Sequence, residues 1–555
     1  MKSILKMFSE HGTLIQPDAL KYIISKENPN EFADFLIKNM KEYPLVLTVD
    51  SIKFTEQSTN IQKLPVIIDN KIIDKKEFQN KILSKIFNSN IILDEVIDKD
   101  EFEDLDKEEQ LISNYKDEEK QTPEKIEFSS VKNWKPLSKE YESEIKIIND
   151  ITGKSTCKGT TEDFVRLFRH RYTVLKKIMR SQRREIANVI PINRLNKNLT
   201  DVQLIGIVKN VKTTVNGHRL IELEDETGTA NVIALKNNNE VNQLAKEVIV
   251  DEIIGVIGKF SKKGDLIIVQ NIIFPDIKIH NGKNKAKHPL CVAFLSDIHI
   301  GSKMFMKNEW NSFLKWINGD LGNSRQKDVA SKIKYLVLPG DLVDGIGIYP
   351  NQEEELSISD IYKQYEALAG YLEQIPDHIT LILQPGNHDA VRPAEPQPAF
   401  EKEIQDLFTG REFVFVGNPC YFSLHGVEIL SYHGQSLLDY STNIQHLNYN
   451  QPTEVMKVML KKRHLAPVYG GYTPIAPEHT DYLIIEKIPD IFVTGHVHTS
   501  NIDDYRGVTL INASSWQAQT SYQKMLNFIP ESAKLPIINL KSGNATTMDF
   551  NQKIT

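Results

Sequence analysis

Several features are scarce in this 555-residue chain, and each scarcity excludes a class of protein. The three cysteines lie far apart and form no Cys-x-x-Cys pair, which argues against a zinc ribbon or a disulfide framework and suits a reducing compartment. The chain has no apolar run of about 18 residues, and its first residues, MKSILKMFSEHG, have no apolar stretch typical of a signal peptide. We therefore expect a cytoplasmic protein without a membrane segment.

Length and charge also constrain the protein. A chain of 555 residues exceeds the size of a single hydrophobic core and predicts roughly three or four domains. The formal net charge is −7, so any affinity for nucleic acid must come from local basic patches.

The N-terminal part predicts a small domain and a linker. Residues 1–72 alternate short helical patterns with a little strand, which indicates a small helical domain. Residues 73–145 are predicted to be a flexible acidic linker, since 94–121 is rich in Asp and Glu and has no sustained apolar face. The alternative for this stretch is an acidic tail that binds a partner.

Residues 146–199 are interpreted as a basic helical segment. Within 161–185, apolar side chains recur on one helical face, and arginine and lysine cover the rest. The expected apolar face comprises Phe164, Phe168, Tyr172, Leu175 and Met179. Two interpretations remain open: a packed helix with a solvated basic side, or a helix whose arginines contact DNA phosphates or a partner. The candidate DNA-binding residues are Arg180, Arg183 and Arg184.

Residues 200–285 change to a strand pattern. Five short β-branched runs are separated by Gly, Asn and Asp turns, which resembles an OB-fold barrel. Such barrels bind single strands or other proteins. The clear aromatic residues near the strands are Phe260 and Phe274, which is few for a base-stacking platform, so use as a scaffold and direct strand binding both stay open.

Residues 286–555 alternate apolar strands with helices, which predicts an α/β domain around a buried sheet. Five predicted strands each end in polar residues, at the position where α/β sheets place their sites. The five clusters are Asp297-Ile-His299, Gly340-Asp341-Leu-Val-Asp344, Gly386-Asn387-His388-Asp389, His433-Gly434 and Gly495-His496-Val-His498.

These clusters have the chemistry of a metal centre. Imidazole, carboxylate and amide oxygen without thiolate suit Mn²⁺ best, with Fe²⁺ or Zn²⁺ as alternatives. One carboxylate can bridge two such ions, which together activate water and clamp a phosphodiester. A single His pair would be a modest clue, but five clusters in order at five strand ends make coincidence remote.

The order DxH, GDxxD, GNHD, H, GHxH over residues 291–498 resembles the calcineurin-like metallophosphoesterases. The resemblance implies an αββα domain with two divalent metal ions. It also implies that His388 acts on the leaving-group side and that Asp344 orients it, as general-acid work by an imidazole requires. One ion would be held by Asp297, His299, Asp341 and His498, and the other by Asp341, Asn387, His433 and His496.

An OB-fold directly before such a domain is similar to the B-subunits of replicative DNA polymerases. A complete ligand set is similar to the small subunit of archaeal family D DNA polymerase. That resemblance implies a proofreading 3′–5′ exonuclease that acts on single-stranded or mismatched 3′ ends and pairs with a large catalytic subunit. The alternative is a non-catalytic scaffold with a structural or vestigial metal site. A free-standing phosphatase would leave the barrel and the basic helix unexplained.

Overall fold

The structure is a computed structural model whose contacts divide the chain into two units, Met1–Asp117 and Glu118–Thr555. It describes residues 134–552 except 197–198, 200, 263–265, 281 and 526, together with Ile126 and scattered residues between 4 and 72. The acidic stretch 94–121 lies outside the described residues.

The described residues of the first unit include two helices that pack around a small apolar core. Phe32 and Leu36 recur at helical spacing and are buried together with Phe8 and Ile23. Helices therefore lie where the pattern of residues 1–72 predicts them. The elements of this unit are β1 (Leu14–Ile15), α2 (Pro17–Ile24), α3 (Pro29–Asn39), β2 (Val46–Leu47), β3 (Ile67–Ile68) and β4 (Lys71–Ile72).

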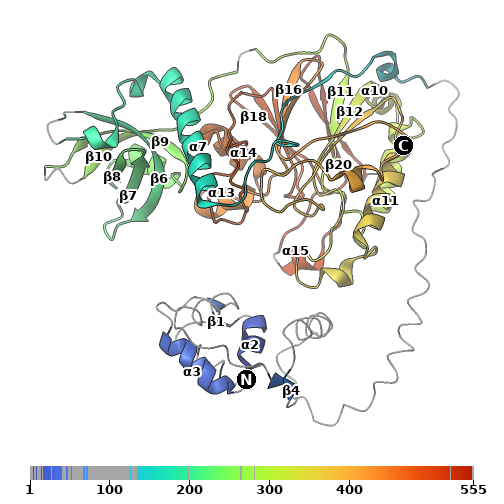
Figure 1. Ribbon diagram of the computed structural model, residues 1–555. Helices are drawn as coiled ribbons and strands as arrows, with labels where there is room; N and C mark the ends of the chain where they lie inside the picture. Colours follow the sequence, from blue (N-terminus) through green and yellow to red (C-terminus); the bar gives the residue numbers. More distant parts are fainter. Residues whose placement is uncertain are drawn as a thin grey trace. The chain divides into compact units, whose positions relative to one another are not determined.

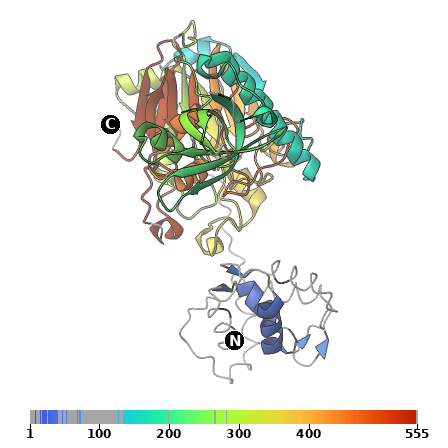
Figure 2. The same ribbon diagram turned by 90° about the vertical axis from the view of Figure 1, so that its left-hand side faces the viewer.

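The second unit begins with a closed five-stranded barrel, drawn in green in Figure 1 and in front in Figure 2. The barrel confirms the five strands that the sequence predicts. Its strands pair in the order β10-β8-β7-β6-β9, and its interior is filled by Val, Ile, Leu and Ala. The elements are β6 (Val202–Thr213), β7 (Arg219–Asp225), β8 (Gly228–Ala234), α8 (Asn239–Lys246), β9 (Ile253–Phe260) and β10 (Ile267–Ile273).

The rest of this unit contains two six-stranded sheets. The first has the order β14-β13-β12-β11-β20-β21, and the second has the order β18-β19-β17-β16-β15-β5. The first comprises β14 (Phe413–Phe415), β13 (Thr380–Gln384), β12 (Ile333–Pro339), β11 (Cys291–Phe294), β20 (Lys534–Asn539) and β21 (Ala545–Asp549). The second comprises β18 (Asn501–Tyr505), β19 (Val508–Asn512), β17 (Ile491–Thr494), β16 (Val427–Ser431), β15 (Cys420–Leu424) and β5 (Ile145–Asn149).

The two sheets pack face to face, and helices cover their outer faces. In β12, Tyr335 and Val337 point into the core between the sheets, whereas Leu336 and Leu338 point to the helices outside. A strand buried on both faces needs apolar residues at every position, which explains its continuous apolar run. The arrangement is four layers, helix–sheet–sheet–helix.

Helices α9, α10 and α11 cover the first sheet, and α13 and α14 cover the second. Their bounds are α9 (Lys307–Ile317), α10 (Ser324–Lys332), α11 (Ile361–Leu372), α12 (Lys402–Gln405), α13 (Leu437–Asn443), α14 (Pro452–Lys462) and α15 (Ser521–Met525). Short 3₁₀ turns are η3 (Leu137–Glu140), η4 (Arg184–Ile186), η5 (Ile192–Arg194) and η6 (Gln352–Glu355). Among the helices of the described residues, none is both long and apolar enough to cross a bilayer.

The sequence-based boundaries between linker, helical segment and α/β domain differ from the structure. Strand β5 pairs with β15, so residues 145–149 are the edge of the second sheet rather than the start of a helical segment. Trp134 packs against the core of the first sheet, and Ser138 is buried. Short polar-flanked strands at a sheet edge have little periodicity, and for this reason the pattern did not reveal them.

Helix α7 (Thr161–Gln182) joins the barrel to the two sheets (Figure 1). It begins at a capping box in which Thr160 accepts from the Asp163 amide. Leu167 packs in the core outside the second sheet, and Tyr172 packs with Ile205 and Ile253 of the barrel. Helix α14 also contacts the barrel, because buried Lys462 pairs with buried Glu252 at 2.6 Å. Helix α14 is therefore packed against the barrel despite its basic composition.

Candidate metal centre

The seven predicted ligands meet at the carboxyl ends of five strands. Strands β11, β12 and β13 are parallel to one another, as are β16 and β17, so their carboxyl ends lie at one edge of each sheet. The loops after these strands carry the predicted residues toward one another. The structure brings together the residues Asp297, His299, Asp341, Asn387, His433, His496 and His498.

The first group contains Asp297, His299 and His498. The two imidazole Nε2 atoms are 3.0 Å apart, and His498 Nε2 lies 3.4 Å from Asp297 Oδ1. Two nitrogens that each lie about 2.1 Å from one ion, at angles near 90–110°, are themselves about 3.0–3.4 Å apart. These separations fit three ligands of one divalent cation.

The second group contains Asp341, His433 and His496, with Asn387 beside it. His433 Nε2 lies 3.3 Å from Asp341 Oδ2 and 2.9 Å from Asn387 Oδ1. Asp341 Oδ2 is also 4.0 Å from His299 Nε2 of the first group. The same carboxylate oxygen therefore lies between the two groups, which is the place of a bridging ligand.

The backbone around these side chains is unusual. Five of the seven residues adopt positive φ, namely Asp297 (50°), His299 (54°), Asp341 (51°), His496 (67°) and His498 (56°). Side-chain-bearing residues rarely occupy this region, and such strain concentrates at functional sites. A Cβ at Gly386 would collide with the carboxylate of Asp341, so the chain passes too close to the centre for any other residue.

Outer partners orient three of the imidazoles. His433 Nδ1–H donates to the Pro339 carbonyl at 2.9 Å, and His299 Nδ1–H donates to the Asp344 carboxylate at 3.0 Å. The Gln523 amide contacts His498 Nδ1 at 3.1 Å. The contacts of His433 and His299 keep the proton on Nδ1 and leave Nε2 facing the centre, as in metal sites where a second partner fixes the tautomer of the ligand, and the contact of His498 orients its ring.

The electrostatics of the centre favour a cation. Burial opposes charge on His433, but the carboxylates of Asp341 and Asp297 raise its pKa to about 10. Burial also opposes charge on Asp341, yet its histidine neighbours, His433 first, hold the pKa of that carboxyl well below its usual range. Buried carboxylates that remain ionised attract positive charge strongly. The donor set of carboxylate, imidazole and amide, without a cysteine in any of the three clusters found in the described residues, fits Mn²⁺ or a similar ion.

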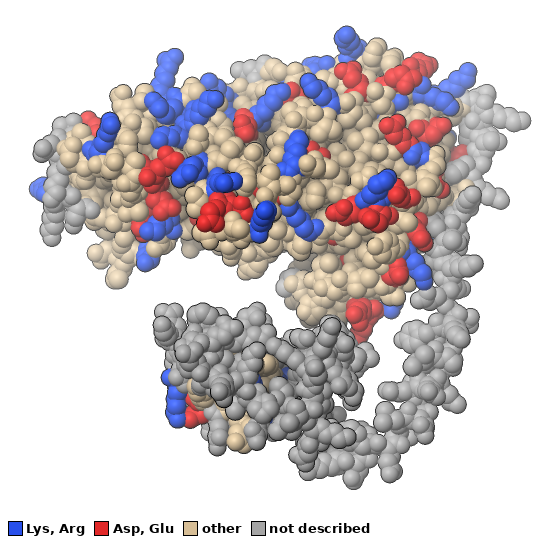
Figure 3. All heavy atoms as spheres, in the orientation of Figure 1, with Lys and Arg blue, Asp and Glu red and all other residues tan. Residues whose placement is uncertain are grey.

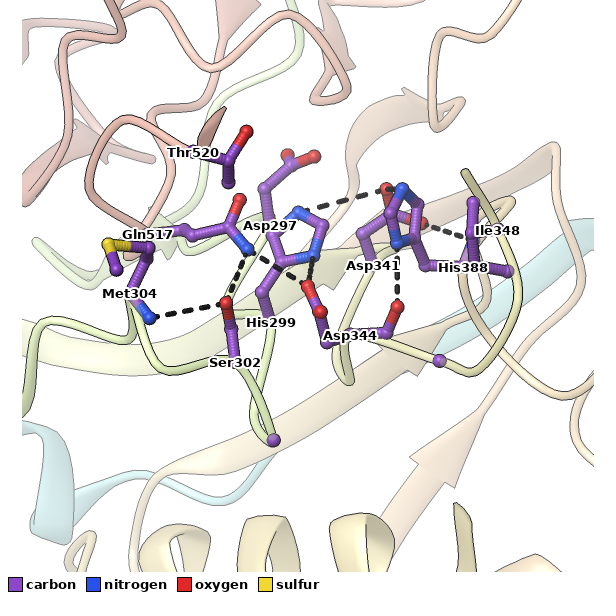
Figure 4. A network of polar contacts seen from close by, with 12 residues as sticks. Asp297, His299, Ser302, Met304, Asp341, Asp344, Ile348, His388, Gln517 and Thr520 are labelled. Atoms are coloured by element: carbon purple, nitrogen blue, oxygen red, sulfur yellow. Dashed lines mark hydrogen bonds and ion pairs between the residues drawn. The ribbon is translucent and has the colours of Figure 1, made fainter. Parts of the chain in front are cut away.

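Asp344 contacts His388 through its main chain rather than through its carboxylate (Figure 4). His388 Nδ1–H donates to the backbone carbonyl of Asp344 at 2.8 Å. The Asp344 carboxylate instead accepts from His299, and from Gln352 and Gln517. Asp344 thus steadies His388 through its main chain and orients a predicted metal ligand through its side chain.

Sequence reasoning missed three glutamines around the centre. Gln517 donates to Asp344 Oδ1 and to Ser302, Gln352 donates to Asp344 Oδ2, and Gln523 contacts His498. Glutamine has no characteristic spacing, so only a three-dimensional contact identifies these residues. Residues 514–540 supply Gln517, the short helix α15 with Gln523, and then β20.

The basic helix α7 combines solvated and buried charges. Lys and Arg side chains gather over α7 on the face seen in Figure 3. Arg180 and Arg184 are exposed, but Arg183 is only 25% exposed and its Nη2 lies 3.6 Å from Asp276. Arg171, expected on the solvated side, is fully buried, and its Nε lies 2.7 Å from Asp481. Exposure thus leaves Arg180 and Arg184 as DNA-contact candidates.

The barrel aromatics do not offer a stacking surface. Phe274 is buried, with the ammonium groups of Lys461 and Lys462 over its ring, and Phe260 packs against the barrel core. Base stacking needs an exposed aromatic face. These contacts favour the scaffold interpretation of the barrel.

Known proteins resemble this chain over most of its length. Residues 292–502 match the family model of the alpha/epsilon DNA polymerase B-subunit. The DNA polymerase II small subunit of Archaeoglobus fulgidus is 47% identical, over 70% of this chain and 77% of that protein. The protein of the same name from Methanocaldococcus jannaschii is 43% identical, over 75% of this chain and 70% of that protein. The DNA polymerase II small subunit of Methanothermobacter thermautotrophicus is 40% identical, over 72% of this chain and 82% of that protein.

Proposed function

The chain belongs to the family of archaeal DNA polymerase II small subunits, and on that basis we propose that it is the 3′–5′ exonuclease and assembly subunit of a two-subunit DNA polymerase. The four-layered unit would be a calcineurin-like metallophosphoesterase domain, and the barrel an OB-fold. The observation that carries the proposal is the position of Asp341 Oδ2 between the two ligand groups, 3.3 Å from His433 and 4.0 Å from His299. A carboxylate in this position can hold two ions close together, as a two-metal hydrolase requires.

Two divalent cations, most suitably Mn²⁺, would occupy the centre. The first would be held by Asp297, His299, Asp341 and His498, and the second by Asp341, Asn387, His433 and His496. When bound, such ions supply a water of lowered pKa and offset the charge of the phosphodiester.

His388 would serve as the proton donor. Its Nδ1–H is held by the Asp344 carbonyl at 2.8 Å, and its Nε2 lies 3.9 Å from Asp341 Oδ2, at the edge of the centre. The ring therefore presents Nε2 to the metal centre, which supports a role next to the bound phosphodiester. A proton held at Nε2 can pass to the departing 3′ oxygen, which is general-acid catalysis.

The barrel, α7 and α14 would carry the assembly role with a large catalytic subunit. Buried ion pairs tie these elements together, including Arg171 with Asp481 and Lys462 with Glu252. Such a rigid unit offers a fixed surface for another chain. Residues 1–117 form a separate unit, so their deletion should leave association with the large subunit intact in co-purification. The cut must precede Trp134, because that side chain packs on the first sheet.

The alternative is a scaffold whose metal site is vestigial. A vestigial site has no need of outer partners, yet His299, His433 and His498 each contact one. These contacts favour the enzyme.

The test is hydrolysis by the full chain, alone and with its large subunit, on 3′-labelled and 5′-labelled single strands with Mn²⁺ or with chelator. Stepwise shortening from the 3′ end that chelator abolishes is the expected result. Absence of hydrolysis in every Mn²⁺ condition would establish the scaffold alternative, and shortening from the 5′ end would overturn the polarity.

A further inference from the structure

Three tyrosines that no sequence motif singles out meet at the rim of the metal centre. Tyr349 follows the GDxxD loop, Tyr449 precedes α14, and Tyr522 lies on α15. Tyr349 lies beside His388, with ring centroids 6.5 Å apart. Tyr449 meets His496 edge to face at 6.4 Å. Aromatic rings therefore flank the centre both at the proposed proton donor and at a ligand of the second ion.

Tyr349 and Tyr522 form a stacked pair. Their ring centroids are 5.5 Å apart and their planes differ by 23°. Glu355 holds both partners, since one carboxylate oxygen accepts from the Tyr349 hydroxyl at 3.1 Å and the other from the Ser521 amide at 3.0 Å. Next to Tyr522, Gln523 contacts the metal-ligand candidate His498. The pair is thus fixed relative to the metal centre at both ends.

Packing does not account for this pair. In the described part of the chain, neither ring belongs to any of the hydrophobic core clusters. Tyr522 is 41% exposed, and Ile346 and Ile348 on the neighbouring loop are also exposed. Tyr522 is thus an exposed ring stacked on Tyr349, whose hydroxyl is held by Glu355, and its position outside the cores suits contact with a flat ligand.

The ligand that fits is a nucleobase. Every base has a π-face, so stacking on tyrosine tolerates any sequence, as removal of any terminal nucleotide requires. A paired terminal base is already stacked and hydrogen-bonded in the duplex and must leave it to meet a protein ring.

We propose that Tyr522, backed by Tyr349, stacks on the terminal nucleobase of an unpaired DNA 3′ end and so positions the scissile phosphodiester over the metal centre. This inference rests on the proposed exonuclease function and adds the feature of the substrate that is recognised, an unpaired base. Selection of unpaired over paired ends then follows from geometry, without any contact to a particular base edge.

The first test compares single strands that end in a normal or an abasic 3′ nucleotide, with the full chain in complex with its large subunit. Tyr522→Ala should raise KM on the normal strand by about 5- to 150-fold. On the abasic strand it should change KM little, and Tyr522→Phe should behave as wild type on both. The control is Tyr362→Ala, which removes a 51% exposed tyrosine of α11 and should leave KM unchanged on both strands. An equal rise in KM on the normal and the abasic strand would indicate a merely structural role of Tyr522 and overturn the inference.

The second test does not need hydrolysis. A strand that ends in 2-aminopurine loses fluorescence when that base stacks on a ring, so titration in chelator reports stacking alone. Quenching by wild type and by Tyr522→Phe, with little quenching by Tyr522→Ala, is the expected result. Equal quenching by all three would overturn the inference. Quenching by an enzyme that hydrolyses neither strand would instead contradict the proposed function while supporting base stacking.

Discussion

The metal centre and helix α7 are both dense in charge, but their charges are used differently. At the centre, the loops after five strands turn His299, Asp341 and their partners inward and bury them. Along α7, the basic residues divide between solvent and interior, since Arg180 is exposed and Arg171 is buried against Asp481. The motifs at the centre predict which side chains point inward, whereas the number of arginines in α7 does not predict which of them are buried.

The difference has a physical origin. Strand ends and the i, i+2 spacing fix which side chains share a face, so local sequence determines the geometry of the centre. The surroundings of a helical arginine depend on which segment packs against it, and for Arg171 that segment lies 310 positions away, at Asp481. Functional assignments from composition are therefore weakest where tertiary contacts decide burial. The following predictions test this contrast.

Asp341→Asn should produce the largest effect on activity. The variant keeps the shape of the side chain but weakens both ion sites, because one carboxylate lies between them. Hydrolysis should fall by more than the about 10²–10⁴-fold that the loss of an acid–base group produces. Metal content measured on the purified variant should drop for both ions. A variant with two ions and full activity would contradict the bridging assignment.

His388→Ala should lower hydrolysis by about 10²–10⁴-fold, the range for acid–base groups, while both ions stay bound. A substitution that only disturbed the orientation of His388 would leave metal binding unchanged. Asp344→Asn should instead affect metal binding, because the Asp344 carboxylate contacts His299. It should lower metal affinity by roughly 10–100-fold. Metal titration separates the two variants. Unchanged metal affinity in Asp344→Asn would restore the role that the sequence predicted for it.

Arg171→Met should destabilise the protein by up to about 3–5 kcal/mol, since it removes the cation beside the buried Asp481 carboxylate, which His464 and the Leu483 amide still contact. Denaturant unfolding measures this change. The matched control is Arg169→Ala, which breaks the exposed Arg169–Glu226 pair and should cost less than about 1 kcal/mol. Similar costs for both variants would remove the distinction between the two sides of α7.

The pair Arg180→Ala/Arg184→Ala should weaken DNA binding and reduce the slope of log K against log salt by about 1 for each phosphate that the variant no longer neutralises. Arg183→Ala should leave that slope unchanged, because its guanidinium faces Asp276. Titrations at several salt concentrations provide the measurement. An unaltered slope in the double variant would assign the exposed arginines to solvation or to a partner protein.

His464 makes the stability of the protein depend on pH. Burial, with Arg171 nearby, lowers its pKa to about 4, below the roughly 6.5 of an unfolded histidine. The unfolded chain therefore takes up more protons, and stability falls as pH decreases from about 6.5 to 4, by roughly 3 kcal/mol at most. His464→Gln should flatten the dependence of Tm on pH between 7 and 5, whereas exposed His446→Gln should not.

Much of the fold was predictable from the sequence. The apolar strands that precede Asp297, Asp341, Asn387, His433 and His496 form as β11, β12, β13, β16 and β17, and five further strands close into the barrel. Buried strands and turn residues are local signals, so no tertiary information is needed to find them.

Other parts depend on distant partners and left no local signal. Strand β5 is defined by hydrogen bonds to β15, about 270 residues later, and the Asp344 carboxylate is directed to His299 by glutamines from two other loops. The apolar face of α7 also differs from the prediction, since Leu167 is buried while Phe164 and Phe168 remain half-buried. These features follow from packing rather than from periodicity.

The position of β11 between β12 and β20 has a consequence for biosynthesis. Strand β11 begins at Cys291 and its neighbour β20 at Lys534, and synthesis at about 5–20 residues per second separates them by roughly 12–50 s. The five barrel strands are already made by Ile273 and can close before this interval begins. During the interval one edge of β11 has no strand beside it, although Asp297 and His299 directly follow. The last predicted ligand, His498, is also made within this interval, so the metal centre is assembled late, while one edge of β11 is still open.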